Sequence, residues 1–242
     1  MLASGLARAD NIVLPLPPED QQKVTDNLGP GVVGNALPSK PIQDASVYFP
    51  LRDKVLTYQI TVGPDAGTTQ TFGLAKVARF GEKLAWRFQV SPSLAGFIRQ
   101  TPGGDLIMPV VTDAREGVVV FTTPANPFVL NGMKPGETRS YSQQVSVYAL
   151  DDPADQEYSG SLNGTYTYVG SYQLTVPAGT YQAVLFRIKC EGKVGPAHTQ
   201  DAAYYFFAPG KGVVAMISQE NATAFWIIHI HTTSGMVLTS MW

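Results

Sequence analysis

The sequence predicts a mainly β protein built as a large curled antiparallel sheet, a half-open barrel or a sandwich. Apolar and polar residues alternate over much of its 242 residues, which is typical of strands with one buried face. Turn-forming residues, among them 23 glycines and 18 prolines, interrupt this alternation repeatedly. No extended helical pattern competes with it. These observations favour antiparallel strands joined by short turns.

The composition excludes several classes of protein. Hydrophobic residues make up 44% of the chain, enough for a core, whereas charged residues make up only 15%. The formal net charge is -2 and no block of basic residues occurs, so the sequence gives no support for a nucleic-acid partner. No apolar run reaches the ~18–20 residues of a membrane-spanning helix, and we expect no transmembrane segment.

The first nine residues are similar to the end of a secretory signal peptide. Ala7-Arg8-Ala9 has the small-x-small form of a cleavage site, and the acidic Asp10 follows it. The basic start and the full apolar core of such a peptide are missing, and chance is the alternative because alanine is common. We interpret residues 1–9 as a residual signal-peptide tail and expect a periplasmic or secreted bacterial protein.

Residues 10–46 are predicted to form an extended arm, because prolines and glycines crowd this part of the chain. Within it, Pro18–Leu28 can form one short helix, with proline and acidic residues in its first turn and Gly29 after its end. The arm is either a linker or a strap over the sheet, and the sequence leaves both open.

Residues 47–242 are predicted to form a single antiparallel β domain. Alternation predicts strands over residues 55–62, 72–80, 84–90, 106–111, 118–122, 141–150, 165–176, 184–191, 204–207, 213–217, 225–231 and 236–242. Turns are expected at residues 81–82, 103–105, 177–179, 208–212 and 234–235, where glycine or proline interrupts the pattern. Residues 192–201 are interpreted as a polar loop.

A faint internal duplication is a further hypothesis. Tyr48-Phe49-Pro50-Leu51 precedes a tyrosine-bearing strand, and Pro127-Phe128-Val129-Leu130 does the same ahead of Tyr141. The spacings differ between the two copies. If the copies are related, the domain divides into halves 47–126 and 127–242.

The strand around Tyr166 is predicted to carry an apolar face. Its even positions from Tyr166 to Val176 are aromatic, aliphatic or glycine, whereas hydroxyl and amide residues dominate the odd positions. In the following strand, Phe186 and Cys190 share the apolar face. The single cysteine cannot form an intramolecular disulfide, and we interpret Cys190 as an inert core thiol.

Three segments of this β domain resemble a bacterial periplasmic or envelope protein family of unknown function, sometimes labelled TapB-like. The family carries the patterns YFPL, VTVPAGTF and YWFAPGxGLVK, in that order. The matching segments here are Tyr48-Phe49-Pro50-Leu51, Leu174–Ala183 and Tyr205–Val214. The sequence departs from the family at Thr57, where an aromatic residue is frequent, and at Ala215, where lysine is usual. The resemblance implies an exported β-rich fold and leaves the function open, because these motifs carry no chemistry.

A search for catalytic or metal motifs finds one constellation, His229-Ile230-His231. In a strand the two imidazoles project to the same face ~6–7 Å apart, and with a carboxylate such as Asp201 or Glu220 they could bind zinc or copper. The alternative is that the histidines form the polar face of a strand. Because no phosphate loop, nucleophile elbow or paired-cysteine pattern occurs, we expect no cofactor and no catalytic residue.

Aromatic side chains give the other lead to function. They could line a cavity in a curled sheet, as in barrels that hold apolar ligands, or they could fill the core against one another. The candidate ligand-binding residues are Trp86, Phe88, Tyr166, Tyr168, Tyr172, Phe186, Tyr204 and Phe206.

The function predicted from the sequence is that of a non-catalytic exported envelope protein. We expect it to bind a lipid or other hydrophobic ligand, or to present a sheet edge to an envelope protein partner. The alternative is a metal-binding protein or metal-dependent hydrolase that uses the His229/His231 pair.

Overall fold

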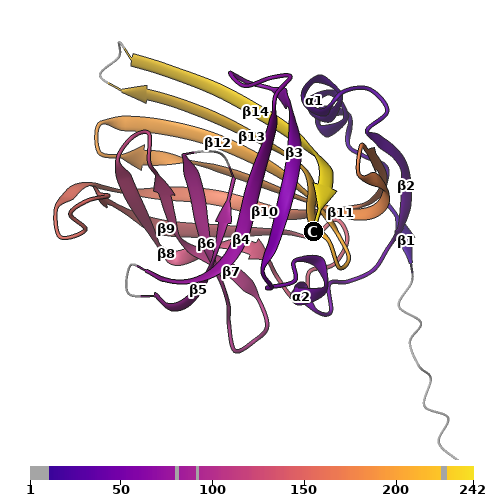
Figure 1. Cartoon of the computed structure of the whole chain (residues 1–242), viewed down its shortest axis with the longest axis horizontal. Coiled ribbons are helices and arrows are strands. Elements are labelled where there is room, and N and C mark those ends of the chain that lie inside the picture. Colours follow the sequence, from indigo (N-terminus) through magenta and orange to yellow (C-terminus); the bar gives the residue numbers. More distant parts are fainter. Residues whose placement is uncertain (1–10, 80–81, 91–92, 225–227) are drawn as a thin grey trace, which may run out of the picture.

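The computed structural model describes residues 11–79, 82–90, 93–224 and 228–242, which form one antiparallel sheet (Figure 1). Of the fourteen strands in these residues, the twelve from β3 to β14 form a closed barrel, because β9 pairs with β10 as well as with β8. The other two, β1 and β2, continue the sheet from β10. The predicted mainly β class is confirmed, and the curled sheet is closed.

The strands lengthen toward the C-terminal half of the chain. The two helices are α1 (Pro18–Leu28) and α2 (Ala45–Tyr48). The strands are β1 (Ile12–Val13), β2 (Val33–Ser39), β3 (Lys54–Val62), β4 (Thr69–Arg79), β5 (Glu82–Gln89), β6 (Leu94–Gln100), β7 (Leu106–Asp113), β8 (Val118–Val129), β9 (Thr138–Ala149), β10 (Gln156–Val176), β11 (Gly179–Val194), β12 (Ala197–Ala208), β13 (Gly212–Ala224) and β14 (Ile228–Met241).

Strand β10 closes the barrel because it is long enough to have two partners along one edge. Its 21 residues span about 70 Å at ~3.3 Å per residue. The first half, through Thr167, pairs with β9, and the second half, from Ser171, pairs with β2. Strand β11 pairs along its other edge from Gly160 to Val176. The arm is therefore joined to the barrel through β2.

Most of the predicted elements are present in the structure. The helix Pro18–Leu28 has the predicted ends, with proline at its start and Gly29 beyond its last residue at a φ of 100°. Every predicted strand falls within an observed strand or overlaps one. The predicted turn at 81–82 and the strand start at 225 lie partly outside the described residues.

Three details of the strand prediction were wrong. Residues 192–201 are not a loop, because β11 continues to Val194 and β12 begins at Ala197. Strand β6 was missed altogether. Strand β14 runs through Gly235 without a break, and this glycine allows α1 to approach: a Cβ here would lie 2.3 Å from the Asn27 carbonyl oxygen.

The predicted apolar face of β10 was also wrong beyond Tyr168. Tyr168 pairs with Phe186 and Gly170 pairs with Leu185, so Val169 is an extra residue, a β-bulge. A one-residue insertion reverses the alternation of side chains. Tyr168 therefore shares its face with Phe186, whereas Tyr172 points to the opposite side of the sheet, where it lies beside Val24 of α1.

Aromatic side chains fill one half of the barrel interior. Phe128 of β8 contacts Phe207 of β12 at a ring-centroid distance of 5.3 Å, although these strands are not neighbours in the sheet. Phe49, which follows α2, packs edge-to-face on Phe128 at 4.9 Å. The Tyr166 hydroxyl donates to the carbonyl oxygen of Phe128 at 2.8 Å, so its buried polar atom is satisfied. This half is a packed core.

Helix α1 covers the outer face of the barrel and is held there by a buried ion pair. Nη1 of Arg187 on β11 lies 2.7 Å from Oδ2 of Asp20 and 2.7 Å from Oε1 of Glu19. Asp20 is fully buried and Arg187 is mostly buried. The helix also contacts β13, β14 and β3. The arm is therefore a strap over the sheet, which resolves the alternative that the sequence left open.

Two further expectations concern the ends of the chain and its internal symmetry. The tail 1–9 lies outside the described residues. The boundary proposed between halves at residues 126 and 127 falls inside β8, and the duplication stays a prediction. Neither helix of the described chain has the length and apolar character needed to cross a membrane.

Candidate functional site

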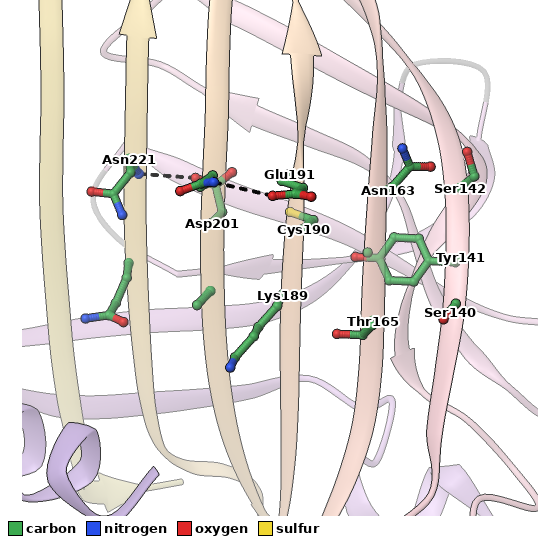
Figure 2. A pocket seen from close by; sticks show the side chains of 14 residues that line it. Ser140, Tyr141, Ser142, Asn163, Thr165, Lys189, Cys190, Glu191, Asp201 and Asn221 are labelled. Atoms are coloured by element: carbon green, nitrogen blue, oxygen red, sulfur yellow. Dashed lines mark hydrogen bonds between the residues drawn. The ribbon is translucent and has the colours of Figure 1, made fainter. Parts of the chain in front are cut away.

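A pocket of about 820 Å³ crosses five neighbouring strands, β9 to β13 (Figure 2). We call it the outer groove. Its lining residues are Ser140, Tyr141, Ser142, Asn163, Gly164, Thr165, Lys189, Cys190, Glu191, Gln200, Asp201, Ala202, Gln219 and Asn221. A pocket of this size falls in the range of ordinary small-molecule sites.

The pairing of the strands shows which way these residues point. Tyr141, Gly164, Cys190 and Asp201 form one row across β9 to β12, since each pairs directly with the next. The row continues to Glu220, which pairs with Asp201. Glu220 lines a cavity in the barrel interior, and residues at the β7–β8 turn line the opposite side of that cavity. The row therefore faces inward. The lining residues on either side of it, such as Lys189 and Glu191, face outward by alternation.

The outward side chains of the outer groove are mainly neutral hydrogen-bonding groups. Hydroxyls come from β9 and β10, and carboxamides come from β10, β12 and β13. The two charged residues among them, Lys189 and Glu191, already have partners. Gln200 donates to the Glu191 carboxylate at 3.3 Å, and Lys189 lies 3.8 Å from Glu19 of α1. The groove therefore offers many donors and acceptors with little net charge.

Burial raises the pKa of the titratable groups in the inward row behind the groove. Burial, together with the nearby Asp201, raises the pKa of the Cys190 thiol to about 12. Burial also raises the pKa of Asp201, although Thr199 and the backbone N–H of Asn221 donate hydrogen bonds to its carboxylate. The pKa of Tyr141 is raised by burial as well. Cys190 is thus a protonated, weakly nucleophilic thiol.

Gly164 sets the geometry of the inward row. A Cβ at this position would lie 2.5 Å from the Tyr141 ring, so the absence of a side chain lets that ring lie over the strand. The Tyr141 hydroxyl then reaches toward Cys190, with which it interacts. The Cys190 thiol on the neighbouring strand β11 is half-buried.

The structure does not bring the predicted ligand-binding aromatics into one site. Tyr166, Tyr168 and Phe186 are packed together inside the barrel, with the Tyr166 and Phe186 rings stacked at 5.0 Å. Phe88 belongs to the same interior core, and Trp86 packs against it, half-buried. The other three lie on the outer face with α1 or Arg187: Tyr172, Tyr204 and Phe206.

The predicted metal pair is only partly described. His229 lies in β14 opposite Thr223, and the position of its side chain is outside what the structure describes. His231 is exposed, and its Nδ1 pairs with the side-chain oxygen of Asn221 at the end of the outer groove. Among the described side chains, no three His, Cys, Asp or Glu residues are grouped to hold a metal ion. Metal binding by this pair stays a prediction.

Comparison with known proteins finds a distant structural likeness. Neither a family model nor a curated protein matches the chain. The hypothetical lipoprotein YmcC of Escherichia coli is 10% identical, with a TM-score of 0.38 over 78% of this chain and 85% of that chain. A candidate lipoprotein of Parabacteroides distasonis is 11% identical, with a TM-score of 0.37 over 83% of this chain and 100% of that one.

A third similar structure is a candidate exported protein with a YmcC-like fold from Bacteroides fragilis. It is 10% identical, with a TM-score of 0.38 over 84% of this chain and 98% of that chain. Similarity at this level carries no information on function. The TapB-like resemblance stays a prediction.

Sequence reasoning missed the outer groove because its strands lack alternation there. Lys189 and Glu191 flank Cys190, and Gln200 is followed by Asp201, so both faces of β11 and β12 are polar at this level. The sequence signal at this level is the mainly polar stretch 192–201, which contains two glycines and one proline and is interpreted as a loop.

Proposed function

We propose that this protein is a non-catalytic binding protein of the bacterial envelope, and that it holds an oligosaccharide in the outer groove. The observation that carries the proposal is the lining of the groove. It combines hydroxyl and carboxamide side chains from five strands around a pocket of about 820 Å³. Export is supported by the cleavage-like pattern of residues 7–9.

The chemistry of the lining favours a ligand rich in hydroxyl groups. A serine or threonine hydroxyl both donates and accepts, and a carboxamide offers two donors and an acceptor. Sugar hydroxyls likewise donate and accept, so Ser142, Asn163 and Gln219 can each pair with them without leaving a charge unbalanced. A strongly charged ligand would find only Lys189 and Glu191, which already have neighbours.

The dimensions of the groove favour an elongated ligand. Five strands separated by ~4.8 Å span about 19 Å between the outermost strand axes. The lining residues are distributed over all five strands, from Ser140 on β9 to Asn221 on β13. A chain of several sugar rings can contact such a row of groups, whereas a single small molecule would reach only some of them.

Recognition of a peptide by strand addition is disfavoured at this place. Strand addition needs a free edge with unpaired backbone groups. Strands β9 to β13 are each paired on both sides in the barrel. The free edge of the described sheet is at β1, whose Ile12 and Val13 are exposed. An envelope protein partner at that edge stays a prediction.

A non-catalytic role is supported by the state of the groups behind the groove. The Cys190 thiol has a pKa raised to about 12 and points inward, so it presents no thiolate to a ligand in the groove. Lipid binding, the function predicted from the aromatic faces, has less support, because Tyr166, Tyr168 and Phe186 are fully buried against other side chains.

The proposal is tested by probing the full chain on an array of bacterial oligosaccharides. We expect a signal that Asn163→Ala and Gln219→Ala each weaken roughly threefold to tenfold, the effect of one lost hydrogen bond of ~0.5–1.5 kcal/mol. Gln182→Ala, an exposed carboxamide of β11 outside the groove, is the matched control and should leave the signal unchanged. Absence of any carbohydrate signal, or equal weakening by the control, would contradict the proposal.

A further inference from the structure

A second cavity lies inside the barrel, at the end away from the aromatic core. It measures about 400 Å³ and is enclosed by β13 and β14 on one side. The ends of β5, β6 and β7 and the β3–β4 turn form the other side. We call it the inner cavity. It is separate from the outer groove, because the residues that line the two do not overlap.

The floor of the inner cavity is apolar. Met216 of β13 and Met236 of β14 are paired residues that lie side by side, each 2% exposed. Val90 and Leu94 face them from the ends of β5 and β6. Methionine side chains are flexible and polarisable, and they adapt to apolar groups of different shape. The floor can therefore hold an alkyl or other hydrophobic group.

The rim of the inner cavity is acidic. Asp65, Asp113 and Glu220 line it, whereas Arg115 is its one described basic residue. The charge of Arg115 is already offset, since its guanidinium lies 3.8 Å from Asp113 and 3.1 Å from the neighbouring Glu116. The rim therefore carries an excess of negative charge.

Glu220 occupies the position where this excess is greatest. It pairs across the strands with Asp201 of the inward row, and Asp113 approaches from the opposite side of the cavity. Glu220 is exposed at the rim, yet partial desolvation raises the pKa of its carboxyl; Asp201, Asp113 and Glu116 raise this pKa further, while Arg115 lowers it. A carboxylate surrounded by like charges is stabilised by a cation placed next to it.

We propose that the inner cavity binds an amphipathic cation, a small molecule that joins an apolar body to an ammonium group. The apolar body lies against Met216 and Met236, and the ammonium group lies between Glu220 and Asp113 at the rim. The two halves of such a ligand match the two halves of the cavity, since an alkyl chain alone would leave the excess negative charge of the rim without a cation, and a bare cation would make no use of the apolar floor.

The test is a calorimetric titration of the full chain with octylammonium, octanol and octanoate, which share one apolar body and differ in charge. Ethylammonium, which has the same charge as octylammonium and a much shorter apolar body, is titrated beside them. We expect octylammonium to bind roughly tenfold or more tightly than octanoate, and Glu220→Gln to weaken it by roughly tenfold, since a hydrogen bond to a charged group contributes ~1.5–3 kcal/mol. Glu157→Gln, which changes an exposed carboxylate of β10 outside both cavities, is the matched control.

Several outcomes would overturn the proposal. If octylammonium does not bind, or if octanoate binds as tightly as octylammonium, the acidic rim does not recognise a cation. Ethylammonium binding as tightly as octylammonium removes the role of the methionine floor. If Glu220→Gln binds octylammonium as tightly as the unaltered protein, Glu220 does not contact the ammonium group. Oligosaccharide binding in the outer groove is independent of all these results, because Glu220 does not line that groove.

Discussion

The ion pair between α1 and the barrel gives a quantitative test of the strap. Replacing Arg187 by methionine keeps most of the side-chain volume and removes the positive charge. Asp20, which is fully buried, then loses its partner while its carboxylate remains. A buried charge without a partner destabilises a fold strongly, by ~3–5 kcal/mol, whereas a matched loss of both charges is much milder.

The expected size follows from the burial of the pair. Because the Arg187 side chain is still 16% exposed, we expect a loss of unfolding free energy at the lower end of this range, about 3 kcal/mol. For a chain of this length each kcal/mol lowers the melting temperature by ~2–4 °C, so Arg187→Met should lower it by roughly 6–12 °C. The double variant Asp20→Asn/Arg187→Met should recover most of this loss, since no buried charge remains.

Thermal unfolding followed by circular dichroism measures these differences. The matched control is Arg139→Met, because the Arg139–Glu137 pair has a similar N–O distance of 2.7 Å but both side chains are substantially exposed. An exposed pair contributes ~0–1 kcal/mol, so this variant should change the melting temperature by less than ~4 °C. If Arg187→Met is as mild as Arg139→Met, or if the double variant is no more stable than the single one, the strap is not held as described.

Three further predictions concern the barrel. Gly235→Ala should destabilise the fold by ~1–3 kcal/mol in chemical unfolding, because its Cβ would clash with the Asn27 carbonyl; Gly73→Ala, with open space around it, should not. Asp201→Asn should stabilise the protein at neutral pH, because the pKa of Asp201 is raised in the folded state and its ionisation therefore opposes folding. The gain in stability should vanish below pH ~3.9, where the carboxyl of the unaltered protein is protonated in both the folded and the unfolded state. Cys190 should react with a disulfide reagent much more slowly in the folded than in the unfolded chain, since its pKa is raised to about 12; equal rates would refute this.

The fold class could be predicted from the sequence because alternation and turns are local signals. The helix Pro18–Leu28 was predicted with its observed ends, since proline, acidic residues and Gly29 mark them directly. Closure of the barrel could not be predicted. It depends on the pairing of β9 with β10, between segments whose register is fixed only when the whole sheet has formed.

The errors have a common physical cause, which is a departure from strict alternation. The bulge at Val169 reverses the faces of β10, and no residue type in the sequence marks it. Strands β11 and β12 extend beyond the core, where both of their faces are polar, so residues 192–201 lacked the pattern of a half-buried strand. Backbone pairing with neighbours holds these strands where apolar burial does not.

The candidate site was the least predictable part of the molecule. The aromatic residues gave the strongest sequence signal, and they belong mainly to the core and to the contact with α1. The outer groove depends on serine, threonine, asparagine and glutamine, which are common in turns and on surfaces and so carry no signal by themselves. Only the pairing of five strands places these residues in two adjacent rows on one face of the sheet.

The central claim is that an oligosaccharide lies in the outer groove, and the side-chain amide signals of the groove test it most directly. In a nitrogen–proton correlation spectrum recorded during titration with an oligosaccharide selected on the array, the carboxamides of Asn163, Gln200, Gln219 and Asn221 should shift together. The carboxamide of Gln182, outside the groove, should stay in place. Shifts confined to residues outside β9 to β13, or none at a saturating concentration, would contradict the account.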